Sequence, residues 1–116
     1  MSLEEIQVVL QTHQEWLNSK GDLGLQANFK GMDLSGYDLR QQDLRGADFT
    51  EVNLQQANLE KANLQGANFQ NANLDFSNLH RANLWGAYLV GASLRHSCLK
   101  KAWAKFADFR RTTWEG

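Results

Sequence analysis

Apolar residues recur every five positions along most of the chain. Leu or Phe stands at every fifth residue from Phe29 to Phe109, and Ala104 is the one break in these seventeen positions. The residue two positions earlier is usually Ala, and the residue immediately before is usually Asn or Asp. A step of five turns an α-helix by about 140° and reverses the face of a strand, so neither element keeps these side chains on one side. The pattern therefore predicts a chain that turns a corner every five residues, with Leu and Ala inside and Asn or Asp outside.

The phenylalanines add a second period of twenty residues. Phe29, Phe49, Phe69 and Phe109 are twenty residues apart or a multiple of twenty, and Leu89 fills the remaining place. We therefore expect four pentads to make one square coil, with like residues stacked in successive coils. At about 4.8 Å per coil, just over four coils make a rod roughly 20 Å long.

The repeated motif resembles that of the pentapeptide-repeat family, whose pattern is A-(D/N)-L-x-x. It occurs as Ala-Asp-Phe at 47–49 and as Ala-Asn-Leu at 57–59 and 62–64, and the resemblance covers residues 27–111. It implies an all-β solenoid, a right-handed quadrilateral β-helix, similar to that of small bacterial and especially cyanobacterial members. It implies no single function, because this fold serves many partners.

The first twenty residues break the rhythm and are predicted to form a helix over residues 3–20. Ser2 and Glu5 fit a capping box, and Gly21 fits the end of the helix. We expect this helix to cap the first coil, with Trp16 as its anchor, because an open solenoid end exposes core and unpaired backbone. A helix that docks on a partner is the alternative. The apolar stripe of the helix comprises Ile6, Val9, Leu10, His13, Trp16 and Leu17.

These patterns divide the chain into three parts. Residues 1–24 form the capping helix and a linker, residues 25–111 the β-helix, and residues 112–116 a C-terminal tail. The opening Met-Ser-Leu and the closing Glu-Gly could be residues added for expression, in which case the natural protein extends further.

Charge and cysteine content narrow the classes of partner. The formal net charge of −1 disfavours nucleic acid as a partner. Residues 1–75 nevertheless carry 11 acidic and 5 basic side chains, whereas residues 76–116 carry 2 acidic and 7 basic ones. Cys98 is the single cysteine, which excludes an intramolecular disulfide and favours a reducing, cytoplasmic location. The chain contains no apolar run of eighteen residues, so we expect no membrane-spanning segment.

No group of residues predicts an enzyme, a cofactor or a metal site. His96 and Cys98 are close in sequence, but two ligands make a weak site, and we interpret them as a surface histidine and a partly buried cysteine. The glycines occupy the last place of their pentads, where they suit the corners. The Asn run is interpreted as hydrogen-bonded to neighbouring backbone, which stabilises the turns.

The candidate binding residues emerge when the outward positions are assigned to the four faces. Trp85, Trp103 and Phe106 converge on one face near the C-terminal end, and exposed aromatic side chains in such a group favour an interaction site. Two alternatives remain: Trp103 and Phe106 could form a closing cap with Trp114, and the neighbouring basic side chains could be an ordinary solvated face. These basic side chains are Arg81, Lys100, Lys101 and Lys105.

The leading functional hypothesis is a non-enzymatic, rigid module that binds another protein, with a homodimer through the C-terminal end as one form of that binding. The resemblance suggests a second hypothesis, because some pentapeptide-repeat proteins mimic DNA and bind DNA gyrase or another topoisomerase. The short rod and the basic C-terminal end count against that mimicry. A third hypothesis is a spacer or targeting domain of a larger protein.

Overall fold

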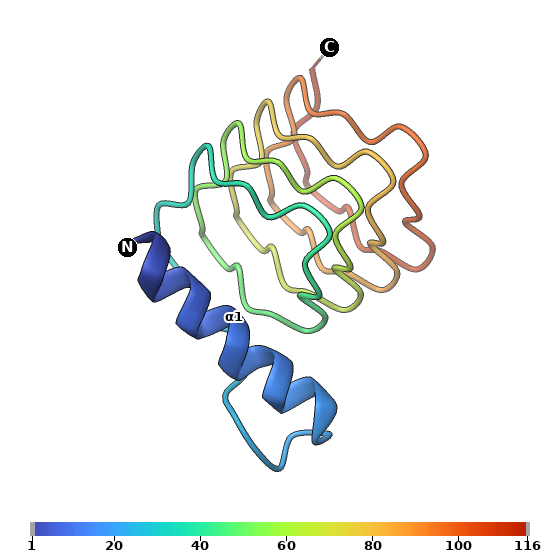
Figure 1. The fold of residues 1–116 in the computed structure, drawn as a ribbon. Helices are drawn as coiled ribbons and strands as arrows, with labels where there is room; N and C mark the ends of the chain where they lie inside the picture. Colours follow the sequence, from blue (N-terminus) through green and yellow to red (C-terminus); the bar gives the residue numbers. More distant parts are fainter. Residues whose placement is uncertain (1, 116) are drawn as a thin grey trace.

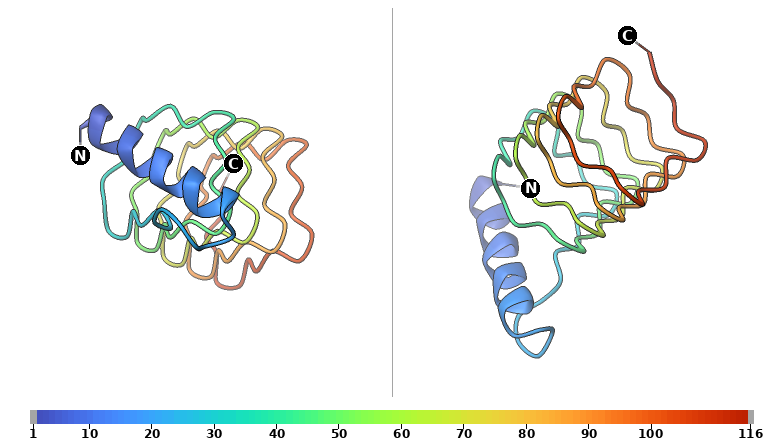
Figure 2. Two further views of the ribbon diagram at one scale, coloured as in Figure 1. Left: turned by 60° about the horizontal axis from the view of Figure 1, so that its bottom comes forward. Right: turned by 90° about the vertical axis from the view of Figure 1, so that its right-hand side faces the viewer.

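The protein is a stack of square coils with one helix across its first end. The computed structural model describes residues 2–115, and Met1 and Gly116, which belong to the terminal segments that could have been added for expression, lie outside this range. The helix α1 spans Leu3–Asn18, and the coils then follow one another from residue 28 to residue 113 (Figure 1). The coils are stacked in order from α1 to the last coil, as the two views of Figure 2 show.

Successive coils are joined by parallel bridges between residues twenty apart. Asn63 pairs with Asp43 on one side and with Asn83 on the other, and the series runs from the Asn28–Asp48 bridge to the Ser93–Thr113 bridge. Within residues 2–115 each bridge involves single residues, because the chain turns before a longer strand can form. The twenty-residue coil and its four corners, which the Leu and Phe periods predict, are therefore confirmed.

Each corner is a tight turn closed by a backbone hydrogen bond. Ala67 N–H donates to the Leu64 carbonyl at 3.0 Å, and the residue two after each core Leu has a positive φ, as at Gly66 with φ of 69°. These are the angles of a type II turn, which favours glycine at that position. The prediction that glycines serve the corners is confirmed. Non-glycine residues also adopt this conformation, including Gln56, Phe76, Arg81, Lys101 and Phe106.

We expect Gly66→Ala to lower the free energy of unfolding by about 1 kcal/mol, because an L-residue is strained at positive φ. Apart from its two chain neighbours, a Cβ at Gly66 would meet no atom within 4 Å, so the change reports backbone strain without a steric clash. The reverse change, Gln56→Gly, should leave stability equal or higher. Urea unfolding of both variants measures the effect, and a loss of several kcal/mol for Gly66→Ala would contradict this account of the corner.

The Asn and Asp side chains stabilise the corners from outside. In thirteen pentads the side-chain Oδ1 of the residue before the core position accepts a hydrogen bond from the backbone N–H two residues later, as Asn53 does from Gln55 at 3.0 Å. This local bond confirms the structural interpretation of the Asn run. In the later coils Tyr88, Ser93, Cys98 and Trp103 take the Asn place, and none of them forms the corresponding bond within residues 2–115.

The core is a narrow column of Leu, Phe and Ala side chains. The rings of Phe29 and Phe49 stack with centroids 5.2 Å apart, and those of Phe49 and Phe69 stack at 4.9 Å. The inward Leu and Phe side chains of the first coils are fully buried, whereas Leu99, Ala104 and Phe109 of the last coil are only half-buried. The two ends of the column therefore differ in how well they are covered.

The helix α1 covers the first coil, as the capping prediction expects. Ser2 caps its N-terminus: the Ser2 Oγ accepts the Glu5 N–H at 3.1 Å and donates to the Glu5 Oε1 at 3.1 Å. Ile6 and His13 are buried against the coil, while Trp16, the predicted anchor, is only half-buried. Among the helices formed by residues 2–115, none is long and apolar enough to cross a membrane.

The C-terminus of α1 differs from the prediction. The helix ends at Asn18, not at residue 20, and two consecutive residues after it have left-handed backbone angles, Lys20 with φ of 57° and Gly21 with φ of 95°. Lys20 N–H donates to the Leu17 carbonyl and Gly21 N–H donates to the Trp16 carbonyl, which together make a Schellman motif. Lys20 thus takes the position of this motif where glycine is usual, and Gly21 follows it, also at positive φ.

His13 links the helix to the first coil through one specific hydrogen bond. Its Nδ1 accepts the Ala27 N–H at 2.9 Å, so this nitrogen carries no proton, and the ring stacks on Trp16 at 5.4 Å. The Nε2 atom is buried without a hydrogen-bond partner among the described residues. Burial lowers the pKa of His13; the Arg45 backbone carbonyl and the Asp43 carboxylate oppose this shift, and the Arg45 side chain reinforces it.

Acid should therefore loosen α1. A lowered pKa in the folded state means that the unfolded chain binds a proton first, so stability falls as the pH drops below about 6.5, the ordinary value for histidine. We expect unfolding in urea at pH 5.5 to lose about 1 kcal/mol relative to pH 7.5, the value of one hydrogen bond. The same comparison in His13→Gln, which cannot titrate, should show a smaller change, and an equal change would contradict this role.

Candidate protein-binding face

One corner of the solenoid carries the residues that the sequence singles out. Trp85 and Lys105 stack in one column, and Gly66, Gly86 and Phe106 stack in the neighbouring column, because residues twenty apart lie in adjacent coils. Backbone bonds fix this register: Gly66 N–H donates to the Trp85 carbonyl at 2.9 Å, and Gly86 N–H donates to the Lys105 carbonyl at 3.0 Å. The side chains of successive coils therefore lie side by side along this corner.

The structure brings Trp85 and Phe106 into direct contact on the outside of the coil. Their ring centroids are 5.5 Å apart with an interplanar angle of 80°, an edge-to-face arrangement. Lys105 Nζ lies 5.2 Å from the centroid of the Phe106 ring, within the range of a cation–π contact. Phe106 nevertheless keeps 71% of its surface exposed, so this pair presents apolar area to solvent.

Trp103 lies on the side that ends at this corner. It takes the outward place that Asn83 holds in the coil before, and the two residues form a parallel bridge. Trp103 is 59% exposed, and no ring contact joins it to Trp85 or Phe106 among the described residues. We call the surface formed by Trp85, Trp103, Lys105 and Phe106 the aromatic face.

Three further cations border the aromatic face at the preceding corner. Arg81 and Lys101 occupy positive-φ positions of adjacent coils, and Arg81 N–H donates to the Lys100 carbonyl at 3.0 Å. Among the ion pairs of residues 2–115, none involves Arg81, Lys100, Lys101 or Lys105. We call Arg81, Lys100 and Lys101 the basic edge, and its charges are available to a partner.

The acidic side chains behave differently, because several are already paired. Asp43 accepts two hydrogen bonds from the guanidinium of Arg45, from Nε at 2.8 Å and from Nη2 at 2.7 Å. This contact lowers the pKa of Asp43 and raises that of Arg45. Asp38 with Arg40, and Asp108 with Arg110, repeat the arrangement. The acidic half of the solenoid therefore presents fewer free carboxylates than its composition suggests.

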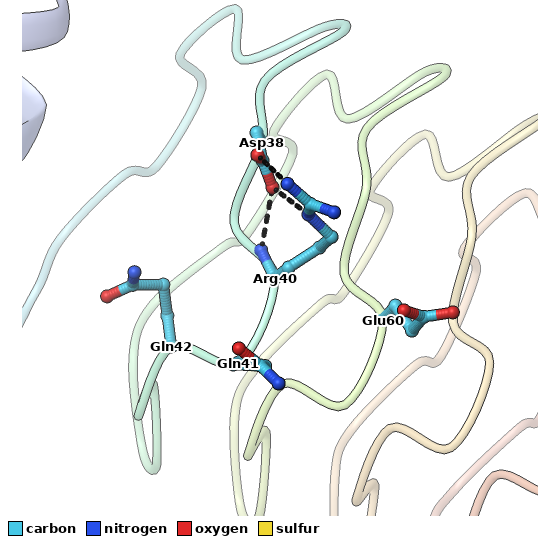
Figure 3. A pocket seen from close by; sticks show the side chains of 5 residues that line it. All are labelled: Asp38, Arg40, Gln41, Gln42 and Glu60. Atoms are coloured by element: carbon cyan, nitrogen blue, oxygen red, sulfur yellow. Dashed lines mark hydrogen bonds and ion pairs between the residues drawn. The ribbon is translucent and has the colours of Figure 1, made fainter.

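Among the hollows formed by residues 2–115, a polar one offers no catalytic pair. It measures about 280 Å³, and its lining includes Gln41, Gln42 and Glu60. Figure 3 shows the Arg40 guanidinium in this hollow turned toward Asp38, which binds it at 2.9 Å. The one arginine is thus already engaged, and Glu60 lies apart from the pair. Nothing in this hollow resembles a nucleophile held beside a base.

The second hollow is an apolar groove of about 330 Å³ that joins α1 to the aromatic face. Trp16 and Leu17 line it from the helix, Gly46 and Gly66 form its floor, and Trp85 lines it from the third coil. Arg45 and Gln65 complete the lining. A Cβ built on Gly46 would lie 3.7 Å from Trp16 Cη2, so the indole ring passes close over this glycine. We call this hollow the tryptophan groove. The twenty-residue period of the sequence predicts that Trp85 lies on this face, but it does not predict the wall that Trp16 and Leu17 of α1 supply.

Cys98 and His96 make no metal site. Both side chains are exposed, so the prediction of a surface histidine is confirmed and that of a partly buried cysteine is wrong. Cys98 takes the outward place before a core position, where Asn stands in earlier coils, and this place faces solvent. His96 stacks instead on Phe76, with centroids 4.9 Å apart. In the described part of the chain, no group of three or more His, Cys, Asp or Glu side chains could hold a metal ion.

Comparison with known proteins agrees with this architecture. The family described as pentapeptide repeats matches eight copies over residues 26–60, 47–86 and 77–113. The chain belongs to the pentapeptide-repeat family, and its fold is the right-handed quadrilateral β-helix of that family. No curated protein matches the chain.

Solved structures of family members provide the structural comparison. The pentapeptide repeat protein Rfr23 from the cyanobacterium Cyanothece 51142 is 38% identical, with a TM-score of 0.75 over 78% of this chain and 62% of that chain. A pentapeptide repeat protein from Nostoc PCC 7120 is 29% identical, with a TM-score of 0.49 over 86% of this chain and 74% of that one. One from the thylakoid lumen of Arabidopsis thaliana is 34% identical, with a TM-score of 0.46, covering 70% and 67%. The chain thus spans a little under two thirds of the length of Rfr23.

Proposed function

We propose that this protein is a rigid, non-enzymatic module that binds another protein through the aromatic face. The observation that carries the proposal is the Trp85–Phe106 pair, which stands outside the core with Trp103 on the same side. Aromatic side chains grouped on an otherwise polar surface are the usual centre of a protein interface. Pentapeptide-repeat proteins are in general structural or interaction modules, which agrees with this role.

Rigidity supports the same function. Every corner is closed by a turn bond, and every coil is bonded to the next through its backbone, so the exposed rings are held by a fixed frame. A preformed surface loses little conformational entropy when it docks. The large apolar side chains can then contribute to affinity with little of that cost.

The free charges indicate the chemistry of the partner. Lys105 and the basic edge add four cations beside the aromatic rings, and none of the four forms an ion pair within residues 2–115. This combination fits a partner surface with acidic residues around an apolar centre. It disfavours a two-fold homodimer through the C-terminal end, because that arrangement would bring the Lys100, Lys101 and Lys105 side chains of two copies together. The paired carboxylates of Asp38 and Asp43 likewise disfavour mimicry of DNA by free acidic groups.

A capture experiment with matched variants tests the proposal. The immobilised protein is used to isolate a partner from a soluble extract of the source organism, and the affinity of the purified partner is then measured. We expect the double variant Trp103→Ala with Phe106→Ala to bind at least about tenfold more weakly. Phe76→Ala is the control, because Phe76 is also an exposed phenylalanine at positive φ but on another corner. Equal binding by the double variant and the wild type would contradict the proposal.

The oligomeric state in solution shows whether the aromatic face binds a second copy of this chain or a different protein. Light scattering of the wild type and of the double variant should give a monomer mass for both. A wild-type dimer that becomes a monomer in the double variant would assign the aromatic face to self-association instead.

A further inference from the structure

The corner that carries the basic edge has two backbone N–H groups that are hydrogen-bonded in every earlier coil. In the coil of residue 60, the Glu60 N–H donates to the Asn58 Oδ1 at 3.1 Å, and the Lys61 N–H donates to the His80 carbonyl at 2.9 Å. The next coil repeats both bonds at residues 80 and 81. One N–H group is thus bound by the side chain of an Asn or Asp, and the other by the following coil.

Both bonds are missing at the last of these corners, which Lys100 and Lys101 form. Cys98 stands where Asn58 and Asn78 stand in the coils before, and the Lys100 N–H finds no acceptor within residues 2–115. Lys101 belongs to the last coil of the described part of the chain, so its N–H has no carbonyl above it there. The corner therefore presents two free donors on adjacent residues.

Three cationic side chains surround these two donors. Arg81 occupies the same place as Lys101 one coil earlier, and the Arg81 N–H donates to the Lys100 carbonyl. All three side chains are exposed, and none forms an ion pair in the described range. Glu60, the carboxylate in the column of Lys100, lies two coils away, with its Oε2 at 3.1 Å from the His80 Nδ1. The positive charge of this corner therefore has no competing carboxylate in its own column.

The other corners of the last coil lack this combination. The Lys105 and Phe106 N–H groups are also free within residues 2–115, but Lys105 is the one cation of that corner and lies over the Phe106 ring at 5.2 Å. At the next corner, the Arg110 N–H donates to the Asp108 Oδ1 at 3.1 Å, and the Arg110 guanidinium binds the same carboxylate. Free donors and free cations therefore coincide at the basic edge.

This set of groups matches a phosphoryl group. A phosphorylated serine or threonine carries nearly two negative charges at pH 7 and three strong acceptor oxygens. Arginine and lysine side chains bind such groups, and free N–H groups of a turn bind anions as well. A carboxylate offers one charge and two oxygens, so it can satisfy fewer of the two N–H groups and three side chains.

We infer that the basic edge binds the phosphoryl group of a phosphorylated serine or threonine in a partner protein, through the Lys100 and Lys101 N–H groups and the three cationic side chains. The inference rests on the proposed protein-binding function and gives it a ligand class. It also gives the loss of asparagine at Cys98 a consequence, because an asparagine there would occupy the Lys100 N–H. A segment bound at this corner lies beside Trp103, two residues beyond Lys101 on the aromatic face.

Titration of the full chain with a phosphopeptide tests the inference. The probe is acetyl-Gly-Ser-Gly-amide phosphorylated on its serine, and the readout is the backbone amide signals in an NMR spectrum. We expect saturable shifts at Lys100 and Lys101, and no shifts with the unphosphorylated peptide. The same peptide with glutamate in place of phosphoserine should bind at least about threefold more weakly.

Four variants test which groups of the corner bind the phosphopeptide. Cys98→Asn restores the acceptor for the Lys100 N–H at constant charge, and we expect it to weaken binding at least about threefold. Tyr88→Asn is its control, because it makes the same kind of change on another side of the solenoid and should leave binding unchanged. Lys101→Gln should also weaken binding at least about threefold. Lys61→Gln removes a charge from the same column, at a corner whose N–H groups are already bonded, and should leave binding unchanged.

Several results would overturn the inference. Equal affinity of Cys98→Asn and the wild type is one, and an equal response to the unphosphorylated peptide is another. The absence of any saturable shift at millimolar phosphopeptide is a third. Tighter binding of inorganic phosphate, or of a short single-stranded DNA, would overturn the assignment to a protein segment. The titrations need no captured partner, and the capture experiment depends on Trp103 and Phe106, so the two proposals fail separately.

Discussion

Leu64→Asp is expected to unfold the whole protein. Leu64 is fully buried in the middle of the core column, with Leu44 and Leu84 at the same place in the coils before and after. The change removes apolar contacts and places a charge where no polar partner is available, which together cost at least about 5 kcal/mol. A domain of this size has a total stability of roughly 6 to 17 kcal/mol, so a loss of this size or more removes the stability margin of a domain at the lower end of that range.

Circular dichroism and urea unfolding measure this effect. Asn63→Ala is the matched control, because Asn63 is the neighbouring residue but points outward. Its Oδ1 accepts the Gln65 N–H at 3.3 Å, and loss of that bond should cost about 1 kcal/mol. A cooperative, native-like transition for Leu64→Asp would refute the inward assignment of every fifth residue.

Removal of residues 1–20 is expected to make the protein associate. The deletion uncovers the first coil, whose core residues Phe29, Leu34, Leu39 and Leu44 are fully buried in the intact protein. It also removes the His13 side chain that accepts the Ala27 N–H. Exposed apolar side chains beside unpaired backbone groups are a template for association. Size-exclusion chromatography with light scattering should show aggregates or oligomers, and a stable monomer of the truncated protein would contradict the capping role of α1.

Two point variants test whether stability depends on the apolar contact between α1 and the first coil. Ile6 is 1% exposed against the first coil, whereas Val8 is 61% exposed on the opposite side of the helix. We expect Ile6→Asp to lower the unfolding free energy by about 3 to 5 kcal/mol and to favour association. Val8→Asp, the same chemical change on the outer side, should stay within about 0.5 kcal/mol of the wild type.

The five-residue and twenty-residue periods in the sequence were sufficient to predict the solenoid. Because the core is one side chain wide, each inward position must be apolar and each corner must recur at a fixed interval, so the pattern of Leu, Ala and Asn leaves little freedom. The stacked rings of Phe29, Phe49 and Phe69 follow from the same regularity. The convergence of Trp85 and Phe106 could also be predicted, since it needs only the twenty-residue register.

Features that depend on side-chain packing could not be predicted in the same way. The tryptophan groove requires the docking angle of α1, which places Trp16 over Gly46 and has no signature in the five-residue pattern. The burial of His13 became clear only with its hydrogen bond to Ala27, because a histidine on an apolar stripe suits several environments. The helix end was misplaced because Lys20 adopts a conformation that usually indicates glycine.

The bridges between residues i and i+20 limit how such a chain can change its length in evolution. An insertion of five residues preserves the alternation of inward and outward positions, so the core survives. It also rotates everything that follows by a quarter turn, and an insertion between Trp85 and Trp103 would carry Trp103 and Phe106 to a different side. An insertion of twenty residues lengthens the rod by one coil and leaves every later residue on the same side of the solenoid as before. Genes of this kind can therefore gain or lose single pentads without loss of folding, but only duplications of a whole coil leave a binding surface in place.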